Sequence, residues 1–455
     1  MKVTSSLIKQ ICLKTKHIDD HDGTGYDQVT IDSRVSLENG LFVPIVGERF
    51  DGHDFLEDAI KNGASATLWQ EGHPLPDDLP SHVHIYFVKD TLQALQQLAE
   101  LYVQDIKPIV VGVTGSNGKT TTKDIIESVV SKSYQTHKTE GNFNNHIGLP
   151  LTILDMPRET ELLILEMGMS GFGEISFLSK LAKPNYAVVT NIGESHIEQL
   201  GSREGIAKAK MEIVDGLNSG GKVIVDGDEP LLTPYLTPKT VCCGYGERND
   251  VRITSVNGNE KGYVFKLANE TSSFMVPLLG KHNVKNTTFA IALARDLAID
   301  DQTIQAGLEE LAITTMRLQT LKGKRNALIV NDAYNASPTS MIAAVETIKS
   351  LNNYMNKVVV LGDMYELGND EEDLHRSVAA SISDPITAVI TIGDRGQWIA
   401  DELRKENSHT MDINSYQTKE EAIPMIESLL DENTVILFKA SRGLQLETII
   451  EKVTS

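Results

Sequence analysis

Residues 109–120 of the chain read Ile109-Val110-Val111-Gly112-Val113-Thr114-Gly115-Ser116-Asn117-Gly118-Lys119-Thr120. A β-branched run leads into this glycine-rich turn, and apolar residues recur at helical spacing over residues 124–130. A strand, a Gly-Lys-Thr turn and a helix in this order are typical of loops that hold phosphates with backbone N–H groups. We therefore expect a nucleoside triphosphate here, with Lys119 on its outer phosphates and Thr120 on its Mg²⁺. The alternative is an ordinary glycine-rich turn, because Val113 stands where a strict phosphate-binding loop has glycine.

The composition is that of an ordinary globular protein, with 455 residues of which 40% are hydrophobic and 23% charged. This length favours about three domains. The net charge of −21 argues against a nucleic-acid partner, since phosphate contacts need clustered lysine and arginine. The three cysteines form no CxxC pair, which indicates a reducing compartment, and no apolar run reaches membrane-spanning length. We expect a cytoplasmic protein without membrane insertion.

Residues 1–105 precede the phosphate-binding loop and predict a separate small α/β domain. Strand-like segments at 28–31, 41–43 and 85–88 alternate with helical segments at 55–62 and 91–101. Asp32-Ser33-Arg34 follows one of these strands, and a second polar segment spans residues 47–53. Either segment could bind a ligand, because loops at strand ends often do, but Asp-Ser-Arg is also a common turn.

Residues 106–315 predict the ATP-binding domain, in which two further strands lead to polar groups. The strand at 161–166 ends in Glu166, which is placed to hold Mg²⁺. The strand at 187–190 leads to His196, which is either a metal ligand or a surface residue. Residues 141–150 are rich in asparagine, which suits a polar ligand but also forms plain loops.

The helix predicted over residues 205–213 carries two lysines that face nearly opposite ways. Lys208 has glutamates four residues before and after it, which is typical of a solvated face. Lys210 instead shares the apolar stripe of Ile206 and Ile213. A lysine near a core loses solvation, so its pKa falls and its neutral amine can take up CO₂ to form a metal-binding carbamate. The alternative is a lysine whose stem packs on the core while its ammonium reaches water.

Short strands at 251–256, 262–267 and 273–278 precede a long helix that begins near residue 280 and runs to Asp296. His282 and Asn286 lie one turn apart on that helix. Side-chain amides suit the edge of a purine, although a polar helix start would look the same.

From residue 316 to 455 the pattern changes to alternating strands and helices. Strands at 327–330, 357–361, 388–392 and 435–438 separate helices near 340–350, 372–382, 396–405 and 418–430. This order predicts an open, mostly parallel sheet whose ligands lie beyond the carboxyl ends of the strands. Polar clusters follow three of these strands, at 331–338, 362–368 and 439–443. Packing alone would not require them.

Three of these motifs together resemble the Mur ligases, the ATP-dependent amide synthetases of peptidoglycan precursor assembly: residues 114–120, 332–338 and 361–368. The resemblance covers essentially the whole chain. It implies an α/β protein of three domains, with a small N-terminal domain, a central P-loop domain and a Rossmann-like C-terminal domain. In two places the chain departs from the family pattern. Met316 precedes Arg317 where glycine is usual, and Ser195 precedes His196 where alanine is common.

The resemblance also implies the reaction, which joins D-alanyl-D-alanine to a UDP-N-acetylmuramoyl-tripeptide. ATP and Mg²⁺ would first convert the peptide carboxylate to an acyl phosphate, and the dipeptide amine would then displace phosphate. Lys210 would be the carbamylated lysine. The C-terminal domain would close over the site, because water would destroy the intermediate. The enzyme would act as a monomer.

Roles for single residues follow from the resemblance as well. The catalytic groups would be Lys119, Lys210, His196 and Arg317. The metal ligands would be Thr120, Glu166, His196 and Lys210. The ATP contacts would be Thr114, Gly115, Ser116, Asn117, Gly118, Lys119, Thr120, His282, Asn283, Asn286, Arg317 and Asp332. The substrate contacts would be Asp32, Ser33, Arg34, Asn142, Asn145, Tyr334, Asn335 and Ser337.

Two rival interpretations are kept. One is another ligase of the same superfamily, either the enzyme that adds the third amino acid or a folate polyglutamate synthetase. The former usually carries an Asp-Asn-Pro motif, which this chain lacks. The other is a regulatory nucleotide switch, which would not need the polar strand ends of the C-terminal domain.

Overall fold

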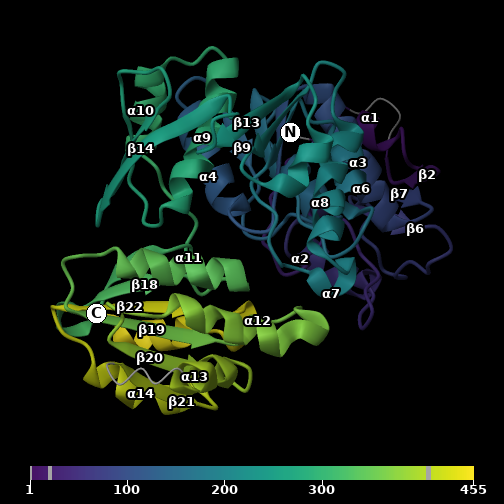
Figure 1. The fold of residues 1–455 in the computed structure, drawn as a ribbon. Coiled ribbons are helices and arrows are strands. Elements are labelled where there is room, and N and C mark those ends of the chain that lie inside the picture. The colour runs from purple at the N-terminus through teal and green to yellow at the C-terminus, as the bar shows by residue number, and fades with distance from the viewer. Residues whose placement is uncertain (1–2, 19–22, 406–410, 455) are drawn as a thin grey trace.

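The computed structural model describes residues 3–18, 23–405 and 411–454, and their strands form three large sheets and one short two-stranded sheet. The three large sheets lie in three successive parts of the chain (Figure 1). The predicted α/β class with three domains is therefore confirmed. We propose domain boundaries near residues 105 and 315, where the chain passes from one sheet to the next.

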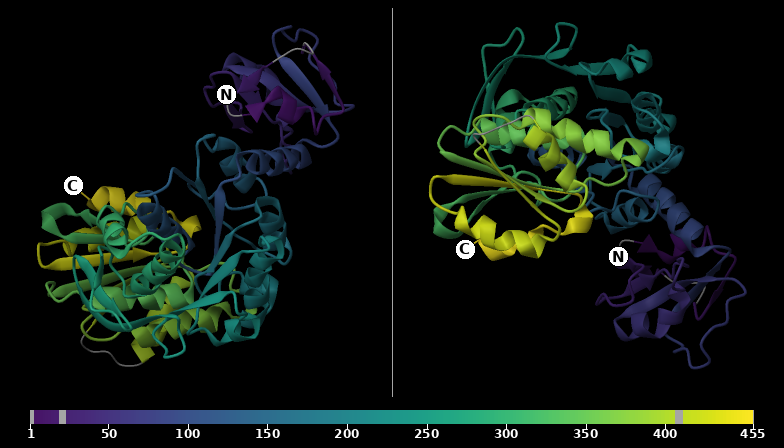
Figure 2. Two further views of the ribbon diagram at one scale, coloured as in Figure 1. Left: turned by 90° about the horizontal axis from the view of Figure 1, so that it is seen from above. Right: turned by 60° about the horizontal axis from the view of Figure 1, so that its bottom comes forward.

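The N-terminal part is built on a five-stranded sheet in the order β2-β7-β6-β5-β4. It projects away from the rest of the chain, and α3 lies at the junction (Figure 2). The buried Tyr102 of α3 donates a hydrogen bond of 2.8 Å to the Met156 carbonyl, which fixes this junction. The elements are β1 (Val3–Thr4), α1 (Ser5–Ile8), β2 (Lys14–Lys16), β3 (Gly25–Tyr26), β4 (Gln28–Thr30), β5 (Gly40–Phe42), η1 (Gly52–Phe55), α2 (Leu56–Lys61), β6 (Ala64–Gln70), β7 (His84–Val88) and α3 (Thr91–Ile106).

The central part is a nine-stranded sheet in the order β16-β15-β14-β13-β12-β11-β8-β10-β9. Its strands are parallel from β9 to β14, and β15 and β16 extend it antiparallel. Because β10, β8 and β11 are adjacent, their carboxyl ends bring Glu166, the phosphate-binding loop and residues 190–196 together. The elements are β8 (Ile109–Thr114), α4 (Lys119–Val130), β9 (Thr136–Lys138), α5 (Gly148–Asp155), β10 (Leu162–Glu166), α6 (Glu174–Ala182), β11 (Tyr186–Val189), α7 (Ile197–Leu200), α8 (Arg203–Met211), η2 (Glu212–Gly216), β12 (Lys222–Asp226), η3 (Pro230–Tyr235), β13 (Thr240–Gly244), β14 (Val251–Asn259), β15 (Gly262–Leu267), β16 (Phe274–Val276), α9 (His282–Asp296) and α10 (Asp301–Glu309).

The C-terminal part is a six-stranded sheet in the order β17-β18-β22-β19-β20-β21, parallel except for β17. Adjacent β18, β22 and β19 end at Asn331, Lys439 and Gly362, so the three polar clusters that follow them meet at one edge. The elements are β17 (Gln319–Lys322), η4 (Lys324–Asn326), β18 (Leu328–Asn331), α11 (Pro338–Lys349), β19 (Asn356–Gly362), η5 (Gly368–Asp370), α12 (Glu371–Val378), η6 (Ala379–Ser381), β20 (Ala388–Ile392), α13 (Gly396–Lys405), β21 (Asp412–Tyr416), α14 (Lys419–Ser428), β22 (Thr434–Lys439), η7 (Arg442–Leu444) and α15 (Glu447–Val453).

The structure differs from the sequence prediction at three elements. Helix α4 begins at Lys119, five residues before the apolar spacing starts, because Gly118 caps it in the left-handed conformation. Its first turns bury polar residues such as Thr122 and Lys123, which hide the helical pattern. Strands β17 and β21 at the two edges of the C-terminal sheet were not predicted. Both are partly exposed, so neither forms a continuous apolar run.

Within the described residues, no helix is long and apolar enough to cross a membrane.

His375 fixes the loop after β19 through both of its ring nitrogens. Its Nε2 accepts a hydrogen bond of 2.9 Å from the Met364 N–H, and its Nδ1 therefore donates to the Glu371 carbonyl at 2.6 Å. Burial lowers the pKa of His375 below its ordinary value, against the opposing effect of the Glu371 carbonyl. The folded protein thus holds this imidazole neutral below the pH at which the unfolded chain protonates it.

We therefore expect the C-terminal domain to lose stability as the pH falls below about 6.5, because the unfolded state then binds the additional proton. His375→Gln should reduce this slope and cost about 1–3 kcal/mol by leaving the Met364 N–H unsatisfied. Urea unfolding can be followed through Trp398, whose ring lies 5.5 Å from that of His375, in a Trp69→Phe background. The exposed His146 provides the control His146→Gln, which should keep the slope. An unchanged slope in His375→Gln would contradict the assignment.

Candidate active site

The phosphate-binding loop is held in shape by the turn that follows β11. Gly115 has φ +150°, and a Cβ atom there would lie 1.8 Å from Thr190 Oγ1. Thr190 Oγ1 also donates a hydrogen bond of 2.6 Å to the Asn117 carbonyl. Gly118 has φ +79° and packs against the amide of Asn286. Glycine is therefore required at both positions, whereas Val113 is a buried residue of β8 and precedes the turn.

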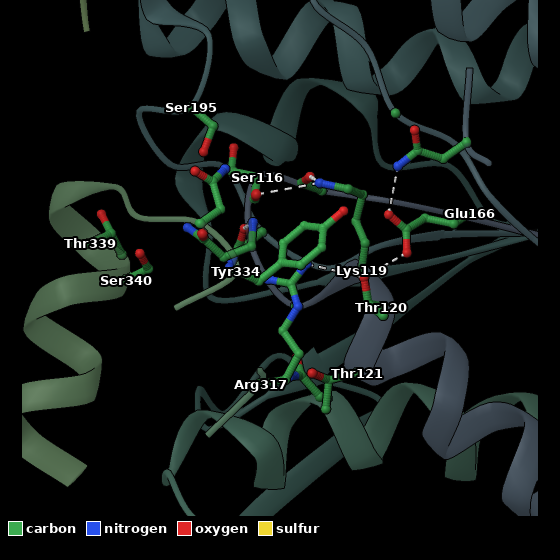
Figure 3. Close-up of a pocket in the computed structure, with 18 of the residues that line it drawn as sticks. Ser116, Lys119, Thr120, Thr121, Glu166, Ser195, Arg317, Tyr334, Thr339 and Ser340 are labelled. Atoms are coloured by element: carbon green, nitrogen blue, oxygen red, sulfur yellow. Dashed lines mark hydrogen bonds between the residues drawn. The ribbon is translucent and has the colours of Figure 1, made fainter. Parts of the chain in front are cut away.

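Lys119 lies over this loop and forms no ion pair with any of the residues that the structure describes. Its Nζ donates to the carbonyl of Gly115 at 2.8 Å and lies 3.5 Å from the carbonyl oxygen of Ser116, so both bonds stay within the loop. Figure 3 shows the side chain of Lys119 reaching toward Ser116. Burial lowers the pKa of Lys119, Glu166 counteracts this effect and Arg317 adds to it. A half-buried ammonium that hydrogen-bonds only carbonyl groups favours an incoming anion such as a phosphate.

Glu166 is 3% exposed and is held by two neutral donors. Thr120 Oγ1 donates to one carboxylate oxygen at 2.7 Å, and Asn144 Nδ2 donates to the other at 2.9 Å. Figure 3 shows Glu166 beside the Lys119 side chain, with its carboxylate directed at Thr120. A carboxylate beside a hydroxyl offers two oxygen ligands of the kind that a hard divalent cation prefers, so the residues present fit Mg²⁺.

Lys210 of α8 points into the same cavity and is 2% exposed, whereas Lys208 on the same helix is exposed. This burial agrees with the prediction that Lys210 lies on the apolar stripe of its helix. Burial first, and then the like charge of Lys119, lowers the pKa of Lys210 well below its usual range. A carbamate at this position would replace repulsion from Lys119 by attraction, so the surroundings fit that modification.

Arg317 enters the cavity from the segment that joins the central and C-terminal parts. Its guanidinium lies 4.1 Å from the ring centroid of Tyr334, and one of its nitrogens donates to Thr120 Oγ1 at 3.4 Å. Its Nε is buried without a hydrogen-bond partner among the described residues. Met316 and Leu318 on either side have φ +64° and +51°, so the backbone takes the left-handed path that glycine would take more freely. The family departure at Met316 therefore leaves the path to Arg317 intact.

The predicted adenine and ribose contacts line the same cavity, and several are already paired. Asn283 donates to the Leu279 carbonyl at 2.7 Å and accepts from Asn286 at 2.9 Å. Asp332 accepts from Lys439 Nζ at 2.6 Å. Burial lowers the pKa of His282, which keeps this imidazole neutral.

These groups surround one cavity of about 390 Å³ between the central and C-terminal parts. Most predicted site residues line it: Gly115, Ser116, Asn117, Gly118, Lys119, Thr120, Asn145, Glu166, His196, Lys210, His282, Asn283, Asn286, Arg317, Asp332, Tyr334 and Asn335. The predicted residues outside its lining are Asp32, Ser33, Arg34, Thr114, Asn142 and Ser337.

The residues outside the lining have local partners. Thr114 donates to the Met167 carbonyl at 2.8 Å, and Asn142 is exposed. In the N-terminal part, both carboxylate oxygens of Asp32 accept from Arg34, at 2.8 and 2.7 Å. A ligand at this turn would therefore compete with an exposed ion pair, which is a weak interaction.

Two of the contacts between the C-terminal and central parts lie at the cavity. Ser337 lies 3.3 Å from Asn117 of the phosphate-binding loop, and Thr339 donates to Glu194 at 2.6 Å. Figure 3 shows Thr339 and Ser340 on α11, across the site from Glu166. The C-terminal part thus contacts both the phosphate-binding loop and the turn that follows β11.

Three residues of the site were not singled out by the sequence analysis. Asn144 holds Glu166, Lys439 pairs with Asp332, and Glu366 contacts His196. Asn144 lies in the asparagine-rich segment, and the other two lie in the polar strand ends. The sequence analysis identified the segments that contain these residues. A local sequence pattern does not show which side chain of such a segment points into the site.

The polar segment 47–53 forms a separate cluster in the N-terminal part. Asp51 contacts His53 at 2.6 Å and His73 at 3.1 Å. The two imidazole rings stack with a centroid distance of 4.2 Å and an interplanar angle of 9°, and one nitrogen of each ring lies within hydrogen-bond distance of the Asp51 carboxylate. His53 Nε2 accepts from the Gln70 N–H, which ties this segment to β6. We interpret the cluster as structural.

Fold and site together define an α/β enzyme whose phosphate-binding loop faces a C-terminal domain across the cavity, and comparison with known families agrees. Three family descriptions match: "Mur ligase family, catalytic domain" at residues 25–103, "Mur ligase middle domain" at 113–294, and "Mur ligase, glutamate ligase domain" at 316–442. The chain belongs to the Mur ligase family.

Comparison with individual relatives indicates which enzymes of this family the chain resembles. UDP-N-acetylmuramoyl-tripeptide–D-alanyl-D-alanine ligase of Bacillus subtilis is 47% identical over 424 residues, which are 93% of this chain and 92% of the relative. The crystal structure of MurF from Acinetobacter baumannii matches with a TM-score of 0.86 at 30% identity, over 99% of this chain and 98% of that one. MurF ligase from Thermotoga maritima, solved in complex with ADP, matches with a TM-score of 0.80 at 29% identity, over 93% and 96%.

Proposed function

We propose that this chain is an ATP-dependent peptide ligase that joins D-alanyl-D-alanine to a UDP-N-acetylmuramoyl-tripeptide. It acts in cytoplasmic peptidoglycan precursor synthesis and releases ADP and phosphate. The observation that carries the proposal is the closed cavity, in which Lys119, Lys210 and Arg317 gather on an otherwise acidic chain. The Bacillus subtilis relative, whose name states this reaction, covers nearly the whole chain.

The cationic groups Lys119 and Arg317 account for the first half of the reaction. A carboxylate is a poor electrophile, so its oxygen attacks the γ-phosphate to give an acyl phosphate and ADP. Phosphoryl transfer of this kind depends on positioning and on charge neutralisation. Lys119 and Arg317 supply positive charge, and Tyr334 holds the guanidinium of Arg317 in place. Thr120, Glu166, His196 and carbamylated Lys210 would hold Mg²⁺, which neutralises phosphate charge when bound.

The second half requires that water stay out. The amine of D-alanyl-D-alanine attacks the acyl carbonyl, the C–O bond to phosphate breaks, and an amide forms. Hydrolysis would compete with this attack. The contacts of Ser337 and Thr339 with the central domain keep the cavity closed during this step.

Carbamylation of Lys210 completes the proposed metal site. Its neutral amine adds to CO₂ and releases one proton, which turns a potential cation into an anion. The low pKa of Lys210 supplies the neutral amine that this step needs. The remaining proposed contacts follow the roles given above: the Asp32–Arg34 turn for the uridine end, Asn142 and Asn145 for the sugar or peptide, and the α9 amides for adenine.

The test is incubation of the purified chain with ATP, the UDP-tripeptide and D-alanyl-D-alanine, followed by mass spectrometry of the product. We expect a UDP-pentapeptide, with phosphate released only when both acceptor and dipeptide are present. Lys119→Ala provides the inactive control. Product formation from a UDP-dipeptide and a single amino acid would instead indicate the ligase that adds the third residue. Turnover that depends on a protein partner would indicate a switch.

A further inference from the structure

Asp124 is a fully buried carboxylate on α4, the helix that follows the phosphate-binding loop, and it does not line the cavity. Its Oδ2 accepts two hydrogen bonds from Thr314, one from the backbone N–H and one from the hydroxyl, both at 2.8 Å. Its Oδ1 faces Lys123 at 3.3 Å and Lys138 at 3.1 Å. Burying a carboxylate costs free energy unless donors surround it. Here the two lysines serve one oxygen, and Thr314 alone serves the other.

Thr314 belongs to the linker that runs from α10 to β17 and joins the central and C-terminal domains. Further along this linker, the Leu318 N–H donates to Asp332 Oδ1 at 3.2 Å. Thr314 therefore fixes the linker to the central domain, and Leu318 fixes it to the C-terminal domain. Residues 315–317 lie between these two anchors. Arg317 is one of them, so its backbone can shift only as far as this short segment allows.

The same side of α4 also contacts the guanidinium of Arg317. Thr120 and Asp124 are four residues apart, so they lie one turn apart on one face of the helix. Thr120 Oγ1 accepts from Arg317 at 3.4 Å, and Asp124 holds the linker three residues before Arg317. One helix thus contacts the side chain of Arg317 at one turn and anchors its backbone at the next.

The position of Asp124 is itself fixed by a buried polar network. Lys123 is 0% exposed, and its Nζ donates to the Thr139 carbonyl at 2.6 Å. Thr139 Oγ1 accepts from the N–H of Glu166 at 3.0 Å. This network joins α4 to the end of β10, so the carboxylate that receives Thr314 belongs to the rigid part of the central domain.

We propose that Asp124 is a positioning residue that holds the interdomain linker at Thr314 and so places Arg317 against the transferring phosphate. Because Asp124 acts through Arg317, this inference rests on the role of Arg317 in the proposed function. Loss of the anchor frees the linker on its central-domain side. The guanidinium then moves away from the γ-phosphate, while the phosphate-binding loop still holds the nucleotide.

The test compares Thr314→Val with the wild type. Valine has nearly the shape of threonine and leaves the two lysines on Asp124, so the variant is expected to fold. Phosphate release should show kcat lowered about 10-fold, while the Kd of a non-hydrolysable ATP analogue stays within about twofold. Thr314→Ser keeps the hydroxyl and should restore the wild-type kcat. Wild-type kcat in Thr314→Val would overturn the proposal.

Thr303→Val provides the matched control. Thr303 likewise donates through its N–H and its hydroxyl to one carboxylate, that of Asp300, at 3.0 and 2.8 Å. This pair lies at the N-terminus of α10, and neither residue lines the cavity. We expect Thr303→Val to keep kcat within about twofold of the wild type, because it is not joined to Arg317. A loss of kcat equal to that in Thr314→Val would reduce the effect to general destabilisation and contradict the proposal.

A double-mutant cycle separates positioning from a merely structural effect. Single-turnover formation of the acyl phosphate is measured for Asp124→Asn, for Arg317→Ala and for both changes together. Asp124→Asn alone should lower the rate about 100-fold. In the Arg317→Ala background it should lower the rate less than about twofold, since the group that it positions is absent. Equal losses in both backgrounds would refute the positioning role. Should Asp124→Asn fail to fold, Thr314→Val takes its place in the cycle.

The same cycle distinguishes this inference from the proposed function. If Arg317→Ala keeps the wild-type rate, the catalytic role of Arg317 fails, and this inference fails with it. If Arg317→Ala is slow while folded Thr314→Val keeps the wild-type rate, only the inference fails.

Discussion

Replacing Lys210 by alanine is expected to reduce ligation at least 100-fold, because the proposed carbamate is the anion that joins Lys210 to the metal site. Because the amine of Lys210 is buried, it does not contribute to the solvated surface of the protein. We therefore expect its removal to affect catalysis. Steady-state phosphate release and product formation measure the effect. Lys208→Ala is the matched control, since Lys208 lies on the same helix but is exposed, and it should retain nearly full activity.

Chemical rescue and pH test whether the carbamate itself is the active form. Small carboxylates such as acetate or formate should restore part of the activity of Lys210→Ala by occupying the place of the carbamate. In the wild type, activity should fall when the pH drops below the lowered pKa of Lys210, because the ammonium cannot add to CO₂. Added bicarbonate should oppose that fall. Full activity of Lys210→Ala without any rescue would refute the assignment.

Arg317→Ala is expected to lower kcat about 1,000-fold, because an arginine placed on a transferring phosphoryl group carries much of the charge stabilisation. Its buried, unpartnered Nε and its stacking on Tyr334 indicate that the guanidinium is held ready for an anion. Arg317→Lys keeps the charge but loses the planar stacking, so it should recover only part of kcat. Single-turnover measurement of acyl-phosphate formation isolates the affected step.

Arg325→Ala is the control for this experiment. Arg325 lies eight residues further along the same domain and is exposed, outside the cavity. Its removal should leave kcat unchanged. If Arg317→Ala changed the KM for ATP but not kcat, Arg317 would bind nucleotide in the ground state without stabilising the transition state.

The sequence predicted the arrangement of elements well wherever the pattern was local. Residues 109–130 hold a strand, a glycine turn and a helix, and the residues after 316 alternate between strands and helices. In both regions the pattern is formed by residues close together in the sequence, so periodicity identifies the elements. The edge strands β17 and β21 escaped prediction because exposed edge strands lack a buried apolar run. The early start of α4 was not predicted, because it depends on the backbone of Gly118 and on a polar turn that neighbouring loops bury.

The chemistry of the site was determined largely by the sequence itself. Residue type and helical phase are local properties, so the sequence shows which groups are available to the site. These groups include the spaced glycines, the glutamate that ends β10 and the lysine on an apolar stripe. Only the tertiary structure decided which groups meet. Asn144 holds Glu166 and Glu366 contacts His196 because parallel strands end at shared edges and two domains close on one another. Such contacts join residues far apart in the chain, and no local pattern can specify them.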